Sequence, residues 1–324
     1  MIKIIKGDKM MDLAAAKFTL TLEVLESMQL PPFKGSTFRG GFGHVFRRIA
    51  CSQRQLRDCR GCLLTNACPY WALFEPGPPA GAEMLGKFEE IPRPFILEPP
   101  ETEQTEFAPG ARIVLNLVLA GKAMDYLPYF ILVFKELGDT GIGKGRAKFR
   151  LEKAESVYPF RNENSILVYD GEKVYNRFHV ITQVEMQDLP ESNADTLGIN
   201  FLTMTRLKSG GAFAEKPEFP LLIRALFRRI SALQYFYCGK KLESDFQAAI
   251  ARAEQVRLIR ADTRWIDWER YSSRQDARMK LGGFVGQAEY AGEGWREFMD
   301  LLRWGELVHV GKGATFGLGR YEIS

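Results

Sequence analysis

Each half of this chain of 324 residues ends with the same three features in the same order. They are an amphipathic helical pattern, a glycine loop with cations, and a short strand pattern. In the first half, the loop covers residues 138–146 and carries Lys144 and Arg146. In the second half, it covers residues 311–319, where the glycines follow the spacing G-x-G-x3-G-x-G. A repeat of this kind, half a chain apart, indicates that one fold has been duplicated. The length of the chain also favours two domains over a single core.

The later glycine loop has the composition of a phosphate-binding site. Its four glycines are Gly311, Gly313, Gly317 and Gly319. A loop without side chains lets a polyanion approach backbone amides, and here Lys312 and Arg320 bracket the apolar centre. The spacing is not that of a nucleoside triphosphate loop, and the loop runs into a strand instead of opening a helix. We therefore expect a phosphate ligand other than ATP.

Hydrophobic periodicity in each half fits the order β-α-β-β-α-β, which is the ferredoxin-like unit. In the first half, strand patterns cover residues 17–24, 111–120 and 147–152, and helical patterns follow Gly35-Ser36-Thr37 and cover residues 124–137. In the second half, strand patterns cover residues 201–207, 264–271, 279–290 and 320–323, and helical patterns cover residues 221–237 and 295–307. Near Phe95 the strand signal is weak.

The expected fold class is α+β, with two tandem ferredoxin-like (RRM-like) domains at residues 1–155 and 156–324. The first domain would carry a Cys-rich insertion at residues 51–75. A hairpin near residues 165–178, turning at Asp170-Gly171, would link the two domains.

The net charge is only +4, so the case for an anionic partner depends on where the charges lie. Between residues 34 and 60, seven cations stand against the single acid Asp58; they are Lys34, Arg39, Arg47, Arg48, Arg54, Arg57 and Arg60. This run favours nucleic acid, although a solvated basic face is the plain alternative. No apolar run is long enough to cross a bilayer or to act as a secretory signal, so we expect a cytoplasmic protein with no membrane partner.

His44 is the sharpest candidate for chemistry. At about 100° per residue, it shares one face of the expected helix with Gly40, Arg47 and Arg48, while the apolar residues occupy the other face. Glycine in a helix costs roughly 1 kcal/mol relative to alanine, so the glycines here suggest close approach of a ligand. An imidazole beside guanidinium groups suits acid–base cleavage of RNA without a metal. The plain alternative is a surface histidine, and we interpret His309 and His179 as structural.

Four cysteines lie within eighteen positions, at Cys51, Cys59, Cys62 and Cys68. In a cytosolic chain, this arrangement favours a metal site over two disulfides, and four thiolates are a typical structural zinc set. An iron–sulfur cluster and free thiols remain the alternatives. A closed set of four ligands has no open position for catalysis, so the expected zinc would only hold the insertion in place.

Segments at both ends of the chain resemble a known family. The run Pro31-Pro32-Phe33-Lys34-Gly35-Ser36-Thr37-Phe38-Arg39-Gly40, the run Gly282-Gly283-Phe284-Val285-Gly286, and residues 301–320 with the glycine loop resemble CRISPR repeat-processing endoribonucleases of the RAMP superfamily. The resemblance implies a basic cleft for repeat RNA, single-stranded or in a short stem-loop, and metal-independent cleavage of the precursor transcript. The products would be guide RNAs with 2′,3′-cyclic phosphate and 5′-hydroxyl ends.

Family members commonly place a catalytic histidine on the first helix, where this chain has His44. By this resemblance, His44 would be the general acid or base, with Arg47 and Arg48 as its partners on the helix. Both glycine loops would then bind RNA, together with Lys34 and Arg39. The alternatives are a non-catalytic RNA-binding RAMP subunit of a CRISPR effector complex and, more distantly, a zinc-dependent DNA-binding protein.

Overall fold

The computed structural model describes residues 11–56, 58–59, 61–77, 91–161, 163–190, 194–272 and 277–324, with the backbone alone between 270 and 280. The chain forms two compact units. One is Ala15–Val180, and the other joins the stretch before Ala15 to Ile181–Ser324. We refer to them as the first and the second unit.

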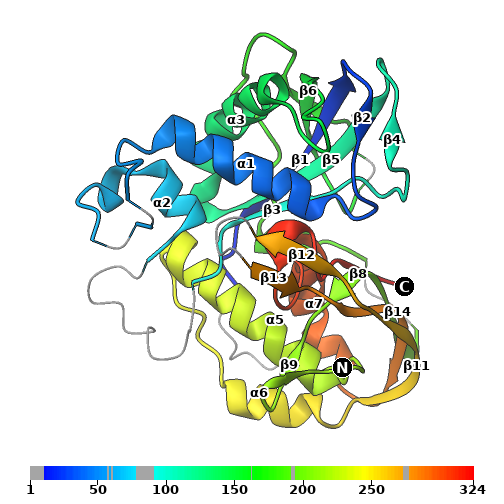
Figure 1. Ribbon diagram of the computed structural model, residues 1–324. Helices are drawn as coiled ribbons and strands as arrows, with labels where there is room; N and C mark the ends of the chain where they lie inside the picture. Colours follow the sequence, from blue (N-terminus) through cyan, green and yellow to red (C-terminus); the bar gives the residue numbers. More distant parts are fainter. Residues whose placement is uncertain are drawn as a thin grey trace. The chain divides into compact units, whose positions relative to one another are not determined.

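The first unit is a five-stranded antiparallel sheet in the order β3-β5-β1-β6-β7. Its strands are β1 (Ala15–Val24), β3 (Phe95–Glu98), β5 (Arg112–Ala120), β6 (Phe149–Val157) and β7 (Ile166–Tyr169). Its helices are α1 (Gly35–Ala50), α2 (Pro69–Phe74) and α3 (Leu127–Thr140), and a small ladder pairs β2 (Met28–Gln29) with β4 (Glu106–Phe107). Helices α1 and α3 lie side by side on one face of the sheet (Figure 1).

The second unit is a four-stranded antiparallel sheet in the order β11-β14-β8-β15. Its strands are β8 (Thr196–Thr205), β11 (Arg257–Ile266), β14 (Gly283–Ala291) and β15 (Tyr321–Ile323). Its helices are α4 (Gln183–Gln187), α5 (Phe219–Leu233), α6 (Phe246–Ala253) and α7 (Met299–Val308), and α5 continues into one π-helical turn. Two short ladders pair β9 (Lys208–Ser209) with β10 (Ala212–Phe213) and β12 (Glu269–Ser272) with β13 (Ala277–Lys280).

The two sheets have the same strand order. When the four main strands of each unit are counted along the chain, both sheets read second, third, first, fourth. In each unit, one helix joins the first strand to the second and another joins the third to the fourth, so the expected β-α-β-β-α-β order is present twice. The mixed α/β class with antiparallel sheets is therefore established.

The structure differs from the expected layout around residues 155–178. The expected boundary between residues 155 and 156 would fall inside β6, which pairs with β1 as far as Val157. The predicted hairpin does turn at Asp170-Gly171, where an antiparallel bridge joins Tyr169 to Val174 and the Tyr175 N–H donates to the Val168 carbonyl at 2.7 Å. Its first strand, β7, belongs to the sheet of the first unit beside β6 and does not link two domains.

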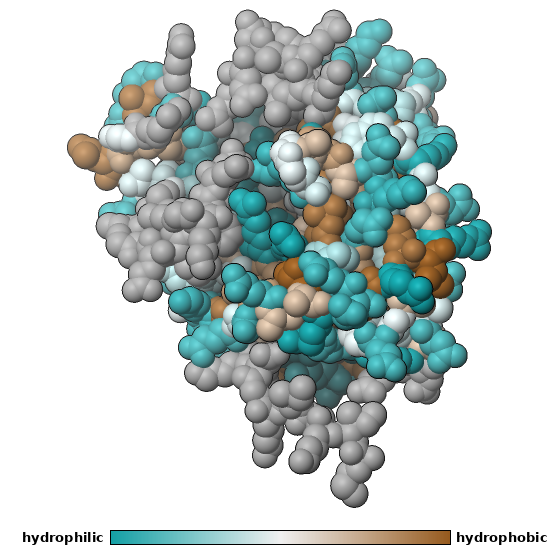
Figure 2. Space-filling model, turned by 90° about the horizontal axis from the view of Figure 1, so that it is seen from below, coloured by the Kyte–Doolittle hydropathy of each residue, from teal (hydrophilic) through white to brown (hydrophobic). Residues whose placement is uncertain are grey.

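Hydrophilic side chains dominate the face drawn in Figure 2, where hydrophobic residues form small separated patches. Among the residues described, no helix is both long and apolar enough to span a bilayer.

Helix α7 holds the last strand of the second unit through a partly buried acid. Glu306 accepts a hydrogen bond from the backbone N–H of Ile323 at 2.8 Å, and the Tyr321 hydroxyl donates to the Leu302 carbonyl at 2.6 Å. Burial, with a smaller contribution from the charge of Glu322, raises the pKa of Glu306 to about 7. Glu306 therefore binds its proton more tightly in the folded chain than in the unfolded chain.

Replacing Glu306 by Gln tests this assignment through pH. Between its ordinary pKa of 4.5 and its folded value of about 7, Glu306 binds more protons when folded, so its contribution to stability is lost as pH rises. Glu306→Gln keeps an acceptor for Ile323 but cannot ionise. In denaturant titrations, we expect the free energy of unfolding of Glu306→Gln to rise relative to that of the wild type between about pH 5 and about pH 8. A pH-independent difference would contradict the assignment.

Candidate functional site

Helix α1 has one buried face and one exposed face, as the sequence predicts. The buried face carries Phe38, Phe42, Val45 and Phe46, each at most 1% exposed. Phe42 stacks on Phe130 of α3, with ring centroids 4.9 Å apart, and on Phe74 of α2 at 5.7 Å. On the opposite face, His44 is exposed, and its imidazole makes no hydrogen bond to any residue described. Packing thus fixes the helix and leaves the histidine in solvent.

Two of the helix glycines are explained by packing, which corrects the expectation that ligand approach explains them all. A methyl group at Gly43 would lie 2.5 Å from Phe74 Cε1. A methyl group at Gly41 would lie 3.0 Å from Leu137 Cδ1 and 3.7 Å from Ile142 Cδ1. Glycine at these positions lets α1 approach α2 and α3 closely.

Gly40 differs from the other two. It is exposed, and a methyl group built there would meet nothing within 4 Å. It lies one helical turn before His44 on the same face. Its lack of a side chain therefore has no packing explanation, and it leaves the surface beside His44 bare.

The two arginines near His44 are engaged by different parts of the first unit. The Arg47 guanidinium donates to the Leu56 carbonyl in the Cys-rich segment after α1. The Arg48 guanidinium donates to Thr140 Oγ1 at 3.1 Å and to Glu136 Oε2 at 3.4 Å, both on α3. Of the two, Arg48 stays on the exposed face with His44, whereas Arg47 is partly buried and braces the Cys-rich segment.

The first glycine loop lies next to this face of α1. It follows the last residue of α3, and its Ile142 packs near Gly41. Its amides are occupied by the fold: the Lys144 N–H donates to the Gln29 carbonyl at 3.1 Å. The side chains of Lys144 and Arg146 are both exposed. The loop therefore presents two exposed cations, and part of its backbone is held by the fold.

The second glycine loop is also closed by its own hydrogen bonds. The Val310 N–H donates to Gly319 O at 2.9 Å, and the Gly319 N–H donates to Met204 O at 3.2 Å. A methyl group at Gly319 would lie 1.8 Å from the Val310 carbonyl, and one at Gly311 would lie 2.5 Å from the Arg206 carbonyl. These glycines permit close backbone approach to β8 and to the loop itself, so packing explains them without a ligand.

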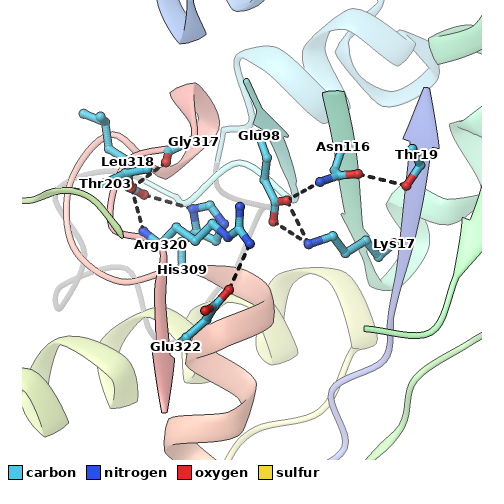
Figure 3. A network of polar contacts seen from close by, with 10 residues as sticks. All are labelled: Lys17, Thr19, Glu98, Asn116, Thr203, His309, Gly317, Leu318, Arg320 and Glu322. Carbon is cyan, nitrogen blue, oxygen red and sulfur yellow. Dashed lines mark hydrogen bonds and ion pairs between the residues drawn. The ribbon is translucent and has the colours of Figure 1, made fainter. Parts of the chain in front are cut away.

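His309 is structural, as predicted. It is fully buried, and its Nδ1–H donates to the Leu318 carbonyl at 3.0 Å (Figure 3). Arg320 is anchored at both ends, because its backbone N–H donates to Thr203 Oγ1 and its guanidinium pairs with Glu322 at 3.2 Å. Lys312, like Arg320, is partly exposed at the margin of the loop.

Lys34 is not available as a surface cation, contrary to the sequence-based expectation. It is 1% exposed, and its ammonium donates to the carbonyls of Pro32 at 2.8 Å and Thr102 at 2.7 Å. Burial lowers its pKa. Arg39 is partly buried, with its guanidinium 4.7 Å from the centroid of the Phe74 ring. Both side chains support the packing of α1.

Two further sets of polar residues carry no sequence motif. In the first unit, Glu98 is 2% exposed and pairs with Lys17 at 2.8 Å, and Asn116 links it to Thr19 across three strands (Figure 3). In the second unit, the Arg206 guanidinium lies 4.3 Å from the centroid of the Phe213 ring. Each set depends on strand register, which a single sequence does not reveal.

The four clustered cysteines are all partly exposed, and none of them forms a disulfide. Burial raises the pKa of Cys59 to about 12, together with the charges of Glu75, Cys68 and Cys51. Those side chains therefore lie near one another. Even so, within the described ranges no three His, Cys, Asp or Glu side chains converge as a metal-binding group. Zinc would require the thiols to move closer together.

Family models match both parts of the chain. Residues 13–183 match the N-terminal domain of the AF_1859_N family, and residues 199–321 match the CRISPR-associated endoribonuclease Cas6. The chain thus belongs to the AF_1859_N family, and its second unit is similar to the CRISPR-associated endoribonuclease Cas6. It is 26% identical over 301 residues to an uncharacterized protein of Archaeoglobus fulgidus, covering 91% of this chain and 92% of that protein.

Solved structures share the fold at low identity. A Cas6 product complex is 16% identical, with a TM-score of 0.58, and covers 96% of this chain and 99% of its own. Cas6 from Thermus thermophilus is 14% identical, with a TM-score of 0.53, and covers 98% of this chain and 100% of its own. A partial Cas6-RT-Cas1–Cas2 complex is 12% identical, with a TM-score of 0.59, and covers 96% of this chain and 46% of its own.

The different surroundings of Gly40 and Gly43 predict opposite effects of the same substitution. Gly40→Ala should raise the free energy of unfolding by about 0.5–1 kcal/mol, because the methyl meets nothing and alanine favours the helix. Gly43→Ala should lower it by about 1–3 kcal/mol, because the methyl overlaps the Phe74 ring. Urea titrations of both variants provide the measurement, and equal effects would contradict the assigned packing.

Proposed function

We propose that the chain is a metal-independent endoribonuclease that cleaves CRISPR repeat RNA in the precursor transcript. The observation that carries this proposal is His44, exposed on the bare face of α1 beside Arg48 and the cationic loop at residues 141–146. The family match supports the RNA-processing class. Two tandem ferredoxin-like units would provide the framework, in a protein acting in the cytoplasm.

His44 supplies the proton transfers in this proposal. A neutral imidazole accepts the proton of a ribose 2′-hydroxyl while O2′ attacks phosphorus, or an imidazolium protonates the leaving O5′ as the P–O5′ bond breaks. The products are a 2′,3′-cyclic phosphate and a 5′-hydroxyl. Arg48 stabilises the negative charge that develops on the phosphoryl oxygens. Arg47, which holds the Leu56 carbonyl, has the lesser part in this account.

The RNA backbone would be bound by cations at the surface of each unit. In the first unit, Lys144 and Arg146 are both exposed, on the loop whose Ile142 packs near Gly41 of α1. In the second unit, Lys312 and Arg320 lie at the margin of the closed glycine loop. These side chains would neutralise phosphates of a single strand or a short stem-loop. A CRISPR effector complex is a further proposed partner.

Substitution of His44 tests the catalytic proposal. We expect the wild-type chain to cleave its repeat RNA in excess EDTA, and His44→Ala to lower the single-turnover rate by about 10²–10⁴-fold. His179→Ala is the matched control, because that histidine bonds the Asn164 carbonyl within the fold. Wild-type cleavage by His44→Ala would contradict the role of His44.

Binding without cleavage would favour the second function. If the wild-type chain binds repeat RNA tightly and yields no product at long times, it acts as a non-catalytic RNA-binding RAMP subunit. The His44 imidazole makes no hydrogen bond to any described residue, and this favours the alternative because no contact orients the imidazole for proton transfer.

We further propose that a structural zinc ion draws together Cys51, Cys59, Cys62 and Cys68, with no part in cleavage. Elemental analysis of purified protein should find about one zinc per chain, lost in Cys59→Ser and kept in Cys238→Ser, where the thiol is outside the cluster. Iron with a visible absorption band would indicate an iron–sulfur cluster instead. Absence of both metals would leave free thiols.

A further inference from the structure

Arg48 is held at two points by the last turn of α3. Its guanidinium donates to Thr140 Oγ1 at 3.1 Å and to Glu136 Oε2 at 3.4 Å. The Thr140 hydroxyl is itself fixed, because it donates to the Glu136 carbonyl at 2.7 Å. The position of the guanidinium is therefore set by a neighbouring helix and not by α1 alone.

Arg48 and His44 lie on one face of α1. Arg48 follows His44 by four residues, which is about one helical turn, so both side chains leave the same face of α1. The C-terminal end of α3 adds a favourable field, because the carbonyl end of a helix carries partial negative charge. The first glycine loop, which carries Lys144 and Arg146, begins directly after this end of α3.

The ion pair is weak enough to exchange. The side chains of Arg48 and Glu136 are 42% and 46% exposed, so water and salt screen their attraction. A phosphate offers the guanidinium a stronger, bidentate partner. Arg48 can therefore leave Glu136 for a phosphate without a large loss in folding stability.

We propose that Glu136 holds Arg48 in the RNA-free chain and competes with the RNA phosphate for it. This inference depends on the proposed function, because it assigns the phosphate ligand of Arg48. Binding of RNA then replaces the Glu136 contact with a phosphate contact. Because RNA must displace Glu136 from Arg48, the ion pair lowers the affinity for RNA. It does not change how Arg48 contacts the phosphate once RNA is bound.

The chain provides a matched control for charge. Asp139 is an exposed acid in the same last turn of α3, and no contact joins it to Arg48 among the described residues. Neutralising Asp139 removes the same charge from the same region. Any effect of Glu136 beyond that of Asp139 therefore reports the contact with Arg48.

The experiment is a double-mutant cycle on the full chain with its repeat RNA. Glu136→Gln and Asp139→Asn are each made alone and together with Arg48→Ala. Dissociation constants are measured in EDTA with an RNA that carries a 2′-deoxy group at the cleavage position, and single-turnover rates with the unmodified RNA. Circular dichroism melts confirm that each variant is folded.

We expect Glu136→Gln to bind RNA about two- to fivefold more tightly than Asp139→Asn does, as loss of a surface ion pair implies. Its cleavage rate at saturating RNA should equal that of the wild type. In the Arg48→Ala background, the two acid variants should bind equally. A purely structural role would not depend on Arg48 in this way.

Equal affinities of the two acid variants with Arg48 present would overturn the inference, and so would an advantage of Glu136→Gln that persists in Arg48→Ala. Either result alongside normal wild-type cleavage would leave the proposed function standing. Failure of the wild-type chain to cleave while the cycle still shows coupling would overturn the nuclease proposal alone. Failure of the wild-type chain to bind RNA would overturn both.

Discussion

The close approach of α1 to its neighbours is the constraint on which the candidate site depends. Gly43 leaves room for the Phe74 ring of α2 and Gly41 leaves room for Leu137 of α3, so α1 packs closely against both helices. The buried face then has a single possible orientation, stabilised by the stacking of Phe42 on Phe74 and Phe130. His44 points into solvent as a consequence of this packing, and not because of any contact of its own.

The same physical requirement explains both glycine loops. In each loop, glycine permits backbone approach that a Cβ atom would block, as at Gly319 against Val310 and at Gly141 against Arg146. Each loop follows a helix and leads into the last main strand of a β-α-β-β-α-β unit. Close backbone approach therefore accounts for glycines in both loops, and the neighbouring cations are the groups that we propose to bind phosphate.

Local periodicity was sufficient to predict α1 and the strand around Phe18, because those features depend on neighbours in sequence. In the second unit it misplaced one strand, since residues 264–271 were expected to form a strand that the structure places at Arg257–Ile266. Contacts between distant residues could not be predicted in this way. Lys34 is buried because Thr102, 68 positions away, supplies a carbonyl. The weak strand at Phe95 pairs with Leu119 and is fully buried, so its sequence lacks alternation. Likewise, Glu136, which accepts a hydrogen bond from Arg48, lies on α3, 88 positions away in the sequence.

The central claim is that an exposed imidazole on α1 cleaves RNA through the ribose 2′-hydroxyl. The most direct test is mass spectrometry of the product ends after incubation with repeat RNA in EDTA. The account predicts a 2′,3′-cyclic phosphate on one fragment and a 5′-hydroxyl on the other, with no products from an RNA lacking the 2′-hydroxyl at the cleavage position. A 3′-hydroxyl with a 5′-phosphate, or cleavage of the deoxy-substituted RNA, would contradict it.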